Sequence, residues 1–203
     1  MRQRVVVLDY GSGNLRSAER ALIRAGAEVT VTADLDRARA ADGLVVPGVG
    51  AFAACMAGIE AVGAAPVVRG RLDAGAPVLG ICVGMQVMFE RGVEHGERSA
   101  GIGVLPGEVT RLVADVVPHM GWNTVEPANG STLFAGLTGE RFYFVHSYAA
   151  HDAGAGTGLV TTSRHGQRFV AAVEREALSV TQFHPEKSGD AGACLLANWL
   201  KSL

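Results

Sequence analysis

The sequence contains no long uninterrupted run of apolar residues. Its apolar blocks, such as residues 5–8 and 43–46, are far shorter than the roughly 20 residues that a membrane-spanning helix requires. The block that follows Arg2 and Arg4 is also too short for the hydrophobic region of a secretory signal, and it ends at Asp9. We therefore expect a cytoplasmic protein without a transmembrane helix.

Cysteine is scarce, and so are runs of one charge sign. The three cysteines, Cys55, Cys82 and Cys194, are an odd number without Cys-x-x-Cys spacing, which argues against a disulfide framework and a structural zinc site. The formal net charge is −2, and Lys and Arg form no long run, so nothing in the charge favours nucleic acid or an anionic membrane as a partner. We expect small molecules or proteins as partners, and no metal or cofactor.

The 203 residues, 48% of them apolar, are enough for one domain over residues 1–203 with a substantial core. In the first half, apolar blocks and helical spacing alternate. Strands are expected at residues 4–10, 27–32, 43–46 and 77–81, and helices at 14–25, 35–41, 52–74 with an interruption near Pro66, and 84–91. Such alternation is typical of an α/β layer fold with a largely parallel sheet, whose ligands gather at the carboxyl ends of the strands.

After Gly101 the apolar blocks become shorter and are divided by Gly, Asn and Asp. Strands are expected at residues 109–113, 142–148, 159–163, 169–174 and 178–183, and a closing amphipathic helix at 191–203. This second half is therefore expected to be more antiparallel. No repeat or low-complexity tract interrupts it.

Cys82 stands between Gly80 and Gly84, where an expected buried strand meets an expected helix. This Gly-x-Cys-x-Gly spacing is typical of a nucleophile elbow, a sharp turn that holds the nucleophile in a strained backbone conformation. The positive end of the following helix favours the thiolate, which is the attacking species. A buried structural cysteine is the alternative interpretation. Cys55 and Cys194 lack flanking glycines, and we expect both to be packing residues.

A thiol nucleophile needs a general base, and a third group must orient that base. His184 ends the strand expected at residues 178–183 and is followed by Pro185 and Glu186. Proline keeps the preceding residue extended, and side chains two positions apart then point to the same side, so Glu186 can reach the ring of His184. A turn with a solvated glutamate is the alternative.

The segment Pro47-Gly48-Val49-Gly50 ends another expected strand, and its glycines free the backbone to turn its amides toward a ligand. We predict that the N–H groups of Val49 and Gly50, with that of Val83, stabilise an oxyanion. A simple strand-ending turn is the alternative. Because Val49 lies between two glycines, we also predict that its peptide rotates, and that the oxyanion hole is incomplete until a partner closes on it.

Together with Gln86, one helical turn after Cys82, these three segments resemble the class I (triad) glutamine amidotransferases over nearly the whole chain. The resemblance implies a three-layer α/β fold and a thioester mechanism. In that mechanism Cys82 attacks the glutamine amide, His184 transfers the proton and Glu186 orients His184. The resemblance also implies a glutamine-binding set made of Gln86 with backbone near Gly48, Gly50, Ser147 and Tyr148.

Within this family, four segments are similar to the glutaminase subunits of imidazole glycerol phosphate synthases, namely residues 9–14, 47–50, 118–123 and 144–148. Many other members read Pro-Gly-Gly where this chain reads Pro-Gly-Val-Gly, so Val49 separates subfamilies. The similarity implies a heterodimer with a (β/α)₈-barrel cyclase subunit, which receives ammonia through a tunnel for histidine biosynthesis and releases AICAR. The chain lacks a phosphate loop of its own, since Gly11-x-Gly13 is followed by Arg16 instead of a third glycine.

Four residues are expected at the partner interface. Met120 and Trp122 flank a glycine in a pattern that suits an interface anchor, although a core tryptophan is the alternative. The resemblance adds Lys187, otherwise a solvated lysine, and Asn14, otherwise a helix cap. We expect His146, which lacks a neighbouring carboxylate, to be a hydrogen-bonded structural histidine.

Three rival functions stay open: another cysteine hydrolase such as a peptidase, a binding module without chemistry, and a glutamine amidotransferase for another acceptor such as chorismate, a nucleotide or a pyridoxal phosphate precursor. Gln86 and the order His184-Pro185-Glu186 speak against the first, and a complete triad speaks against the second. Residues 47–50 and 119–123 favour the histidine pathway over the third.

Overall fold

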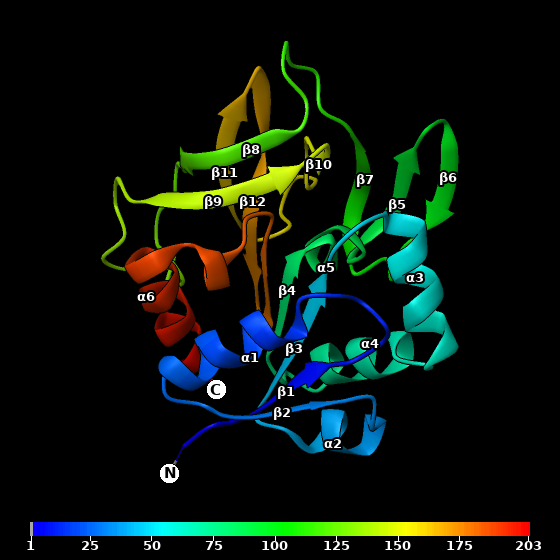
Figure 1. Cartoon of the computed structure of the whole chain (residues 1–203), viewed down its shortest axis with the longest axis vertical. Helices are drawn as coiled ribbons and strands as arrows, with labels where there is room; N and C mark the ends of the chain where they lie inside the picture. Colours follow the sequence, from blue (N-terminus) through cyan, green and yellow to red (C-terminus); the bar gives the residue numbers. More distant parts are fainter. Residues whose placement is uncertain (1) are drawn as a thin grey trace.

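A computed structural model describes residues 2–203 and contains a seven-stranded mixed sheet at its centre (Figure 1). The strands lie in the order β11-β12-β13-β4-β3-β1-β2, in which β13, β4, β3, β1 and β2 run parallel. The strands β11 and β12 pair antiparallel at one side. The expected α/β fold with a largely parallel sheet and a more antiparallel second half is confirmed.

The central strands are β1 (Arg4–Leu8), β2 (Glu28–Thr32), β3 (Gly43–Gly48), β4 (Val78–Cys82), β11 (Leu159–His165), β12 (Gln167–Arg175) and β13 (Leu178–Thr181). The helices are α1 (Leu15–Arg24), α2 (Leu35–Ala40), α3 (Phe52–Ala61), α4 (Ala65–Asp73), α5 (Val83–Gln86) and α6 (Gly189–Leu200), with a 3-10 turn η1 (Pro185–Lys187). Every residue of β3 and β4 is buried, as apolar strands covered on both faces require.

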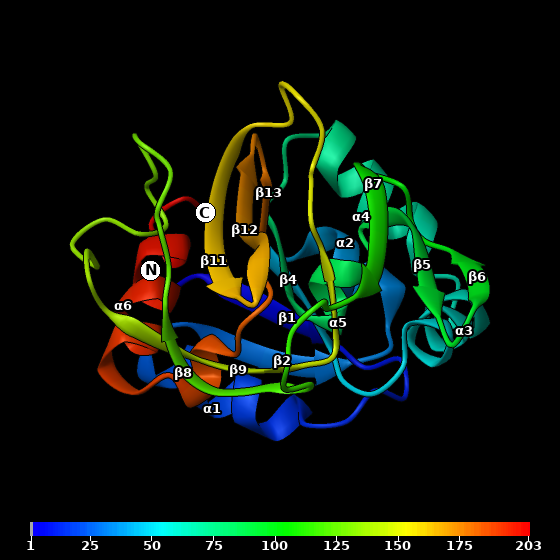
Figure 2. The ribbon, with the colours of Figure 1, turned by 90° about the horizontal axis from the view of Figure 1, so that it is seen from above.

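Helices cover both faces of the central sheet, which makes three layers (Figures 1 and 2). The helices α1 and α6 pack against each other on one face, and α2 packs against α4 on the other. One cluster of buried side chains extends from β1 in the first half to α6 in the second. This continuity supports the expected single domain over residues 1–203, which stays a prediction.

The parallel strands bring four chain segments together at the edge of the sheet that the carboxyl ends of the strands form. The loop after β1, the end of β3, the end of β4 and the segment after β13 all lie at carboxyl ends of neighbouring parallel strands. The register places Gly48 opposite Cys82. This edge is the place where parallel α/β sheets bind ligands.

Two smaller sheets flank this edge. One has the order β10-β7-β5-β6, from β5 (Phe89–Glu94), β6 (Glu97–Ala100), β7 (Leu105–Arg111) and β10 (Tyr148–Ala150). The other pairs β8 (His119–Thr124) with β9 (Arg141–His146). Neither the β5–β6 hairpin nor β8 was expected from the sequence.

Two of the expected helices are wrong in extent. The helix expected at residues 84–91 ends at Gln86, because Phe89 begins a strand that pairs with both β6 and β7. The helix expected over 52–74 is two helices, α3 and α4, and the break falls at residues 62–64 instead of at Pro66. Pro66 lies in the first turn of α4, where its missing N–H costs nothing.

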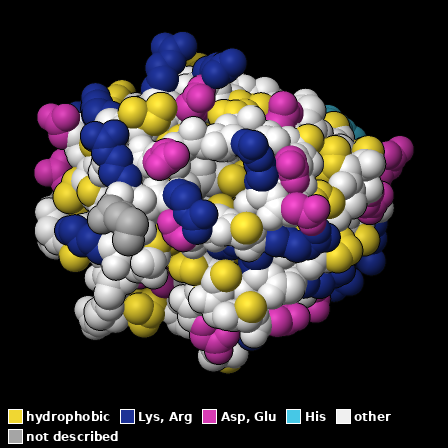
Figure 3. Space-filling model, turned by 90° about the horizontal axis from the view of Figure 1, so that it is seen from below, with side chains coloured by type: hydrophobic (Ala, Val, Ile, Leu, Met, Phe, Trp, Pro, Cys, Tyr) yellow, Lys and Arg dark blue, Asp and Glu magenta, His cyan; other side chains and the backbone are white. Residues whose placement is uncertain are grey.

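In residues 2–203 no single helix is long and apolar enough to cross a membrane. The helices α3 and α4 meet that criterion only when taken together, and they are bent by 83° at their junction. Figure 3 shows the face at the α2 end of the molecule, away from the ligand edge of the sheet, where basic and acidic side chains are interspersed. Exposed ion pairs such as Arg4–Asp42 and Arg39–Asp36 belong to this end and contribute little to stability.

Candidate active site

Cys82 occupies a strained turn between β4 and α5. Its backbone has φ 56° and ψ −114°, a region that non-glycine residues rarely adopt outside functional sites. The turn is possible because Gly84 lies against β3, where a Cβ atom would come within 1.9 Å of the Val46 carbonyl oxygen. The expected nucleophile elbow is therefore present in the structure. Because α5 has a single turn, the helix dipole behind the thiol is smaller than the sequence suggested.

His184 and Glu186 are joined as the sequence predicts. The Nδ1 atom of His184 lies 2.7 Å from Oε1 of Glu186, and both side chains are buried. Burial lowers the pKa of His184, but hydrogen bonds to Cys82 and Glu186 and attraction to their negative charges outweigh it and raise the pKa to about 9. The arrangement therefore favours the protonated form of the His184 ring.

Asn14 completes the support of Glu186. Its Nδ2 donates to the same Oε1 atom of Glu186 at 3.2 Å, while Oε2 is buried without a partner among residues 2–203. Asn14 occupies the N-cap position of α1 in a left-handed conformation, but its side chain makes no capping bond. The helix-cap alternative is therefore wrong for this side chain, which donates its hydrogen bond to Glu186.

A cavity of about 290 Å³ opens onto Cys82 and His184. The other expected site residues that line it are Val49, Gly50, Val83, Gln86, Ser147, Tyr148 and Lys187. Gly48 does not line it. It is buried against the elbow, where a Cβ atom would come within 2.3 Å of the Gly84 amide nitrogen, so its role is the close approach of β3 to the turn.

Hydrogen bonds to the rest of the chain fix the segment expected to form the oxyanion hole, and they leave the Val49 N–H bonded outside the cavity. The Val49 N–H donates to Ser12 Oγ at 3.2 Å, and Ser12 is not among the residues that line the cavity. The Val49 carbonyl accepts a bond from Cys55 Sγ at 3.3 Å, and the Tyr10 hydroxyl donates to the Pro47 carbonyl. Val83 lines the cavity, and as the first residue of α5 its N–H has no partner within that helix. Of the expected donors, Val49 is thus occupied elsewhere.

Two polar residues of the site were not identified from the sequence. Glu94, at the end of β5, lines the cavity, and its carboxylate also accepts a bond from the Phe52 N–H at 3.1 Å. Gln182, directly after β13, is fully buried, and its Nε2 lies 3.9 Å from Cys82 Sγ. The only signal for Gln182 was its place two residues before His184, on the same side of an extended chain.

Gln86 lines the cavity, but both N–H groups of its side-chain amide are hydrogen-bonded to other residues of the chain. Its Nε2 donates to the Tyr148 carbonyl and to Gln182 Oε1, each at 2.9 Å. Its Oε1 is therefore the atom left for a ligand, so Gln86 is suited to accept a hydrogen bond from a substrate N–H group.

His146 also lines the cavity, and it is hydrogen-bonded as expected. Its two ring nitrogens contact the Tyr148 carbonyl at 2.9 Å and His119 Nδ1 at 3.0 Å. Burial lowers the pKa of His146 to about 3, so the ring is neutral and unsuited as the base. In the part of the chain that the structure describes, no group of His, Cys, Asp or Glu side chains is placed to hold a metal ion.

The strand β8 exposes two large apolar side chains. Met120 is 67% exposed and Trp122 is 50% exposed, so the core-tryptophan alternative is wrong for Trp122. The buried tryptophan is Trp199 in α6. Lys187 is exposed and lines the cavity. An exposed apolar pair beside a reactive cavity is typical of a protein contact surface.

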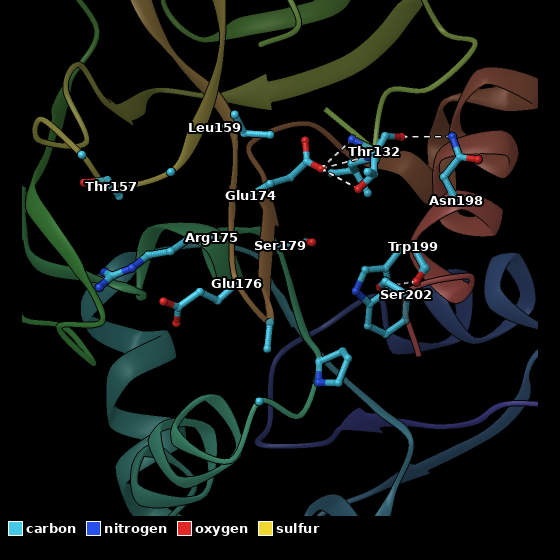
Figure 4. A pocket seen from close by; sticks show the side chains of 16 residues that line it. Thr132, Thr157, Leu159, Glu174, Arg175, Glu176, Ser179, Asn198, Trp199 and Ser202 are labelled. Carbon is cyan, nitrogen blue, oxygen red and sulfur yellow. Dashed lines mark hydrogen bonds between the residues drawn. The ribbon is translucent and has the colours of Figure 1, made fainter. Parts of the chain in front are cut away.

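The cavity of about 650 Å³ shown in Figure 4 is larger but lies far from this chemistry. It lies near the amino ends of β4 and β13, by Pro77 and Ala177, and no cysteine or histidine lines it. Of the two carboxylates that line it, Glu174 and Glu176, the first is already bonded by Ser131, Thr132 and the Leu133 N–H. The smaller cavity is therefore the candidate active site, because Cys82 and His184 both line it and Glu186 is bonded to the His184 ring.

Comparisons with known proteins find similarity over nearly the whole chain. The family model "Glutamine amidotransferase class-I" matches residues 6–203. The imidazole glycerol phosphate synthase subunit HisH of Streptomyces avermitilis is 61% identical over 99% of this chain and 97% of that protein. The protein of the same name from Nocardia farcinica is 61% identical over 100% of this chain and 99% of its own length.

Solved structures share the fold. A crystal structure of a glutamine amidotransferase aligns with a TM-score of 0.73 at 24% identity, over 93% of each chain. The PurLQS structure from Thermotoga maritima aligns with a TM-score of 0.73 at 20% identity, over 99% of each chain. At such identities these likenesses concern the fold alone.

Proposed function

The chain belongs to the class I glutamine amidotransferases, and on that premise we propose that Cys82, His184 and Glu186 form its catalytic triad. The observation that carries this proposal is the elbow cysteine and the Glu186-bonded His184 at one cavity, with Glu186 held 2.7 Å from the His184 ring. The reaction is hydrolysis of the glutamine side-chain amide to glutamate and ammonia.

The reaction proceeds in two steps through a thioester. The Cys82 thiolate attacks the amide carbon, the carbon–nitrogen bond breaks, and imidazolium His184 gives its proton to the leaving nitrogen, which departs as ammonia. His184 then takes a proton from water, the resulting hydroxide attacks the thioester, and the carbon–sulfur bond breaks to restore the thiolate. Glu186 keeps the ring oriented and stabilises its positive charge.

The remaining polar groups of the cavity suit the free amino-acid end of glutamine. The carboxylate of Glu94 fits the α-ammonium group of the substrate, and Gln86 Oε1 offers a second acceptor nearby. Ser147 and Tyr148 line the same cavity. We propose that these four residues hold glutamine, and that Gly48 acts only by packing on the elbow.

The oxyanion hole is proposed to form by rotation of the Val49 peptide. In the present conformation Ser12 holds the Val49 N–H, so only Val83 and Gly50 remain as candidate donors. Rotation brings the Val49 N–H toward the cavity, and the partner subunit favours the rotated state by closing on this loop.

This glutaminase serves as a subunit of imidazole glycerol phosphate synthase in histidine biosynthesis, a role that its full-length relatives at 61% identity support. We propose that the partner is a (β/α)₈-barrel cyclase subunit, bound as a heterodimer in the cytoplasm, and that it receives ammonia through a tunnel. Its contact surface is proposed to include the exposed Met120 and Trp122 on β8, together with Lys187 and the Asn14 loop.

The test is glutamate release from glutamine by the chain alone and with the cyclase subunit and its acceptor substrate. Wild type is compared with Cys82→Ser and with Cys194→Ser, a matched control because Cys194 is an exposed cysteine of α6. Release that requires Cys82 and not Cys194 supports the triad. A chain that cleaves a peptide panel but not glutamine, or is inert under every condition, contradicts the proposal.

The partner surface is tested with a second matched pair. Trp122→Ala is expected to weaken cyclase binding by roughly ten- to hundredfold, as expected for an aromatic anchor. Ile23→Ala removes an apolar side chain that is also 50% exposed, but on α1, and is expected to leave binding unchanged. Calorimetric titration of each variant with the cyclase subunit measures the difference, and equal losses contradict the assignment of β8.

A further inference from the structure

A buried amide side chain lies against the nucleophile on the strand next to β4. Gln182 follows β13, and its own backbone N–H is fixed by a 2.8 Å bond to the Ala171 carbonyl. Its side chain is fully buried, with Nε2 placed 3.9 Å from Cys82 Sγ. Gln182 does not line the cavity, so a substrate does not reach it.

The orientation of this amide follows from its neighbours. The Tyr148 carbonyl can only accept, so the Gln86 atom that contacts it at 2.9 Å must be the donor Nε2. The same Nε2 lies 2.9 Å from Gln182, which must therefore present its oxygen to Gln86. Because its oxygen faces Gln86, the Nε2 atom of Gln182 must face the Cys82 sulfur.

We propose that Gln182 is a further catalytic residue, which donates an N–H hydrogen bond to the Cys82 sulfur and stabilises the thiolate. A thiolate is a stronger acceptor than a thiol, so a fixed N–H donor favours the charged form. Gln86 and Tyr148 are the positioning groups that hold the donor in place. The inference deepens the proposed function, on which it rests, because the thiolate is the nucleophile of that reaction.

The donor and the base lie two residues apart on the segment that follows β13, but they act on the sulfur in different ways. His184 supplies the proton that leaves with ammonia, whereas Gln182 exchanges no proton and serves as a permanent donor. The effect of Gln182 is therefore expected in the ionisation of Cys82 and in kcat, and not in the KM for glutamine, because Gln182 is outside the cavity.

The test is the rate of Cys82 alkylation by iodoacetamide between pH 5 and pH 10, followed by mass spectrometry of the Cys82 peptide in the full chain. Peptide resolution excludes labelling of the exposed Cys194. Gln182→Met keeps the length of the side chain and removes the donor. We expect its pH profile to move to higher pH, with about three- to tenfold slower alkylation at neutral pH, the size of one hydrogen bond of ordinary strength.

The outcome separates this inference from the proposed function. If Gln182→Met retains a cooperative thermal transition and its pH profile coincides with that of the wild type, the proposal is overturned. If that variant does not fold, Gln182→Asn, which keeps an amide but withdraws it by one methylene, is read in the same way. Alkylation needs no turnover, so a wild type that fails to hydrolyse glutamine with its partner refutes the proposed function independently of this result.

In the variant, kcat with the cyclase partner is expected to fall in step with the alkylation rate while KM stays within about twofold. A variant in which KM rises and alkylation is unchanged assigns Gln182 to substrate binding through Gln86, and that result also overturns the proposal.

Discussion

Ser12→Ala is predicted to increase the basal glutaminase activity of the isolated chain. The Ser12 hydroxyl is the acceptor that holds the Val49 N–H out of the catalytic cavity, at 3.2 Å. Removing it leaves this N–H without its partner in the resting state, so the rotated state, in which the N–H faces a substrate oxyanion, becomes relatively more stable. We therefore predict that Ser12 restrains the basal activity.

The size of the effect follows from the bond that is lost. One neutral hydrogen bond contributes about 0.5–1.5 kcal/mol net, so the ratio of rotated to unrotated enzyme rises by roughly two- to tenfold. Cys55 still holds the Val49 carbonyl and Tyr10 still holds Pro47, so the loop is not set free. The basal kcat is expected to rise by that factor, with little change in the KM for glutamine.

The assay is glutamate release by the isolated chain and by the complex saturated with cyclase and acceptor. In the complex the rotation is already favoured, so Ser12→Ala and wild type are expected to converge. Ser17→Ala is the control, because Ser17 lies in the first turns of α1 and its hydroxyl has no hydrogen bond within residues 2–203. If the basal rate of Ser12→Ala equals or falls below that of wild type, the hydrogen bond between Ser12 and Val49 does not restrain the activity and the prediction is refuted.

Three further predictions concern binding and stability. Glu94→Gln is expected to raise the KM for glutamine about tenfold or more in steady-state assays with little change in kcat, and Glu97→Gln, on exposed β6, serves as the control. Arg71 donates to five backbone carbonyls from a buried position, so Arg71→Met is expected to lower the free energy of unfolding by about 2–4 kcal/mol in denaturant titrations. Burial lowers the pKa of His119 to about 4 and that of His146 to about 3, so the unfolded chain binds protons below about pH 6.5 that the folded chain does not. The stability that these two histidines contribute is full above that pH and is lost as the pH drops toward 4, and a thermal midpoint at pH 5 equal to that at pH 7 contradicts this.

The sequence predicts the central sheet well because its buried strands are short apolar blocks between glycines and prolines. It fails at Phe89, where tertiary pairing with β6 and β7 overrides the helical spacing of residues 84–91. It misses β8, since Met120 and Trp122 alternate with glycine and asparagine and form no apolar block. In β8 the apolar side chains point to solvent, which reverses the usual signal.

The turn at Cys82 and the bonded pair of His184 and Glu186 were accessible from the sequence because local geometry determines them. The glycines around Cys82 and the proline after His184 fix backbone shapes that need no distant contact for their recognition. Glu94 and Gln182 were not accessible, since only the pairing of β5 and β13 with their neighbours brings them to the cavity and the sulfur. The sequence likewise does not predict that the Val49 N–H is already hydrogen-bonded, because its acceptor, Ser12, is 37 residues away.

These contacts divide the control of the reaction between its two reacting atoms. In the proposed mechanism the sulfur of Cys82 already has the protonated His184 ring and the Gln182 amide beside it, so the nucleophile is prepared in the resting chain. The site that would stabilise the oxygen of the substrate amide is not yet complete, because the Val49 N–H is hydrogen-bonded to Ser12. Loss of one oxyanion donor costs about 10²–10³ in rate, more than the roughly tenfold that one hydrogen bond to Ser12 can restrain. Release of Ser12 alone therefore recovers only part of the full rate, and the remainder must come from the free energy of partner binding.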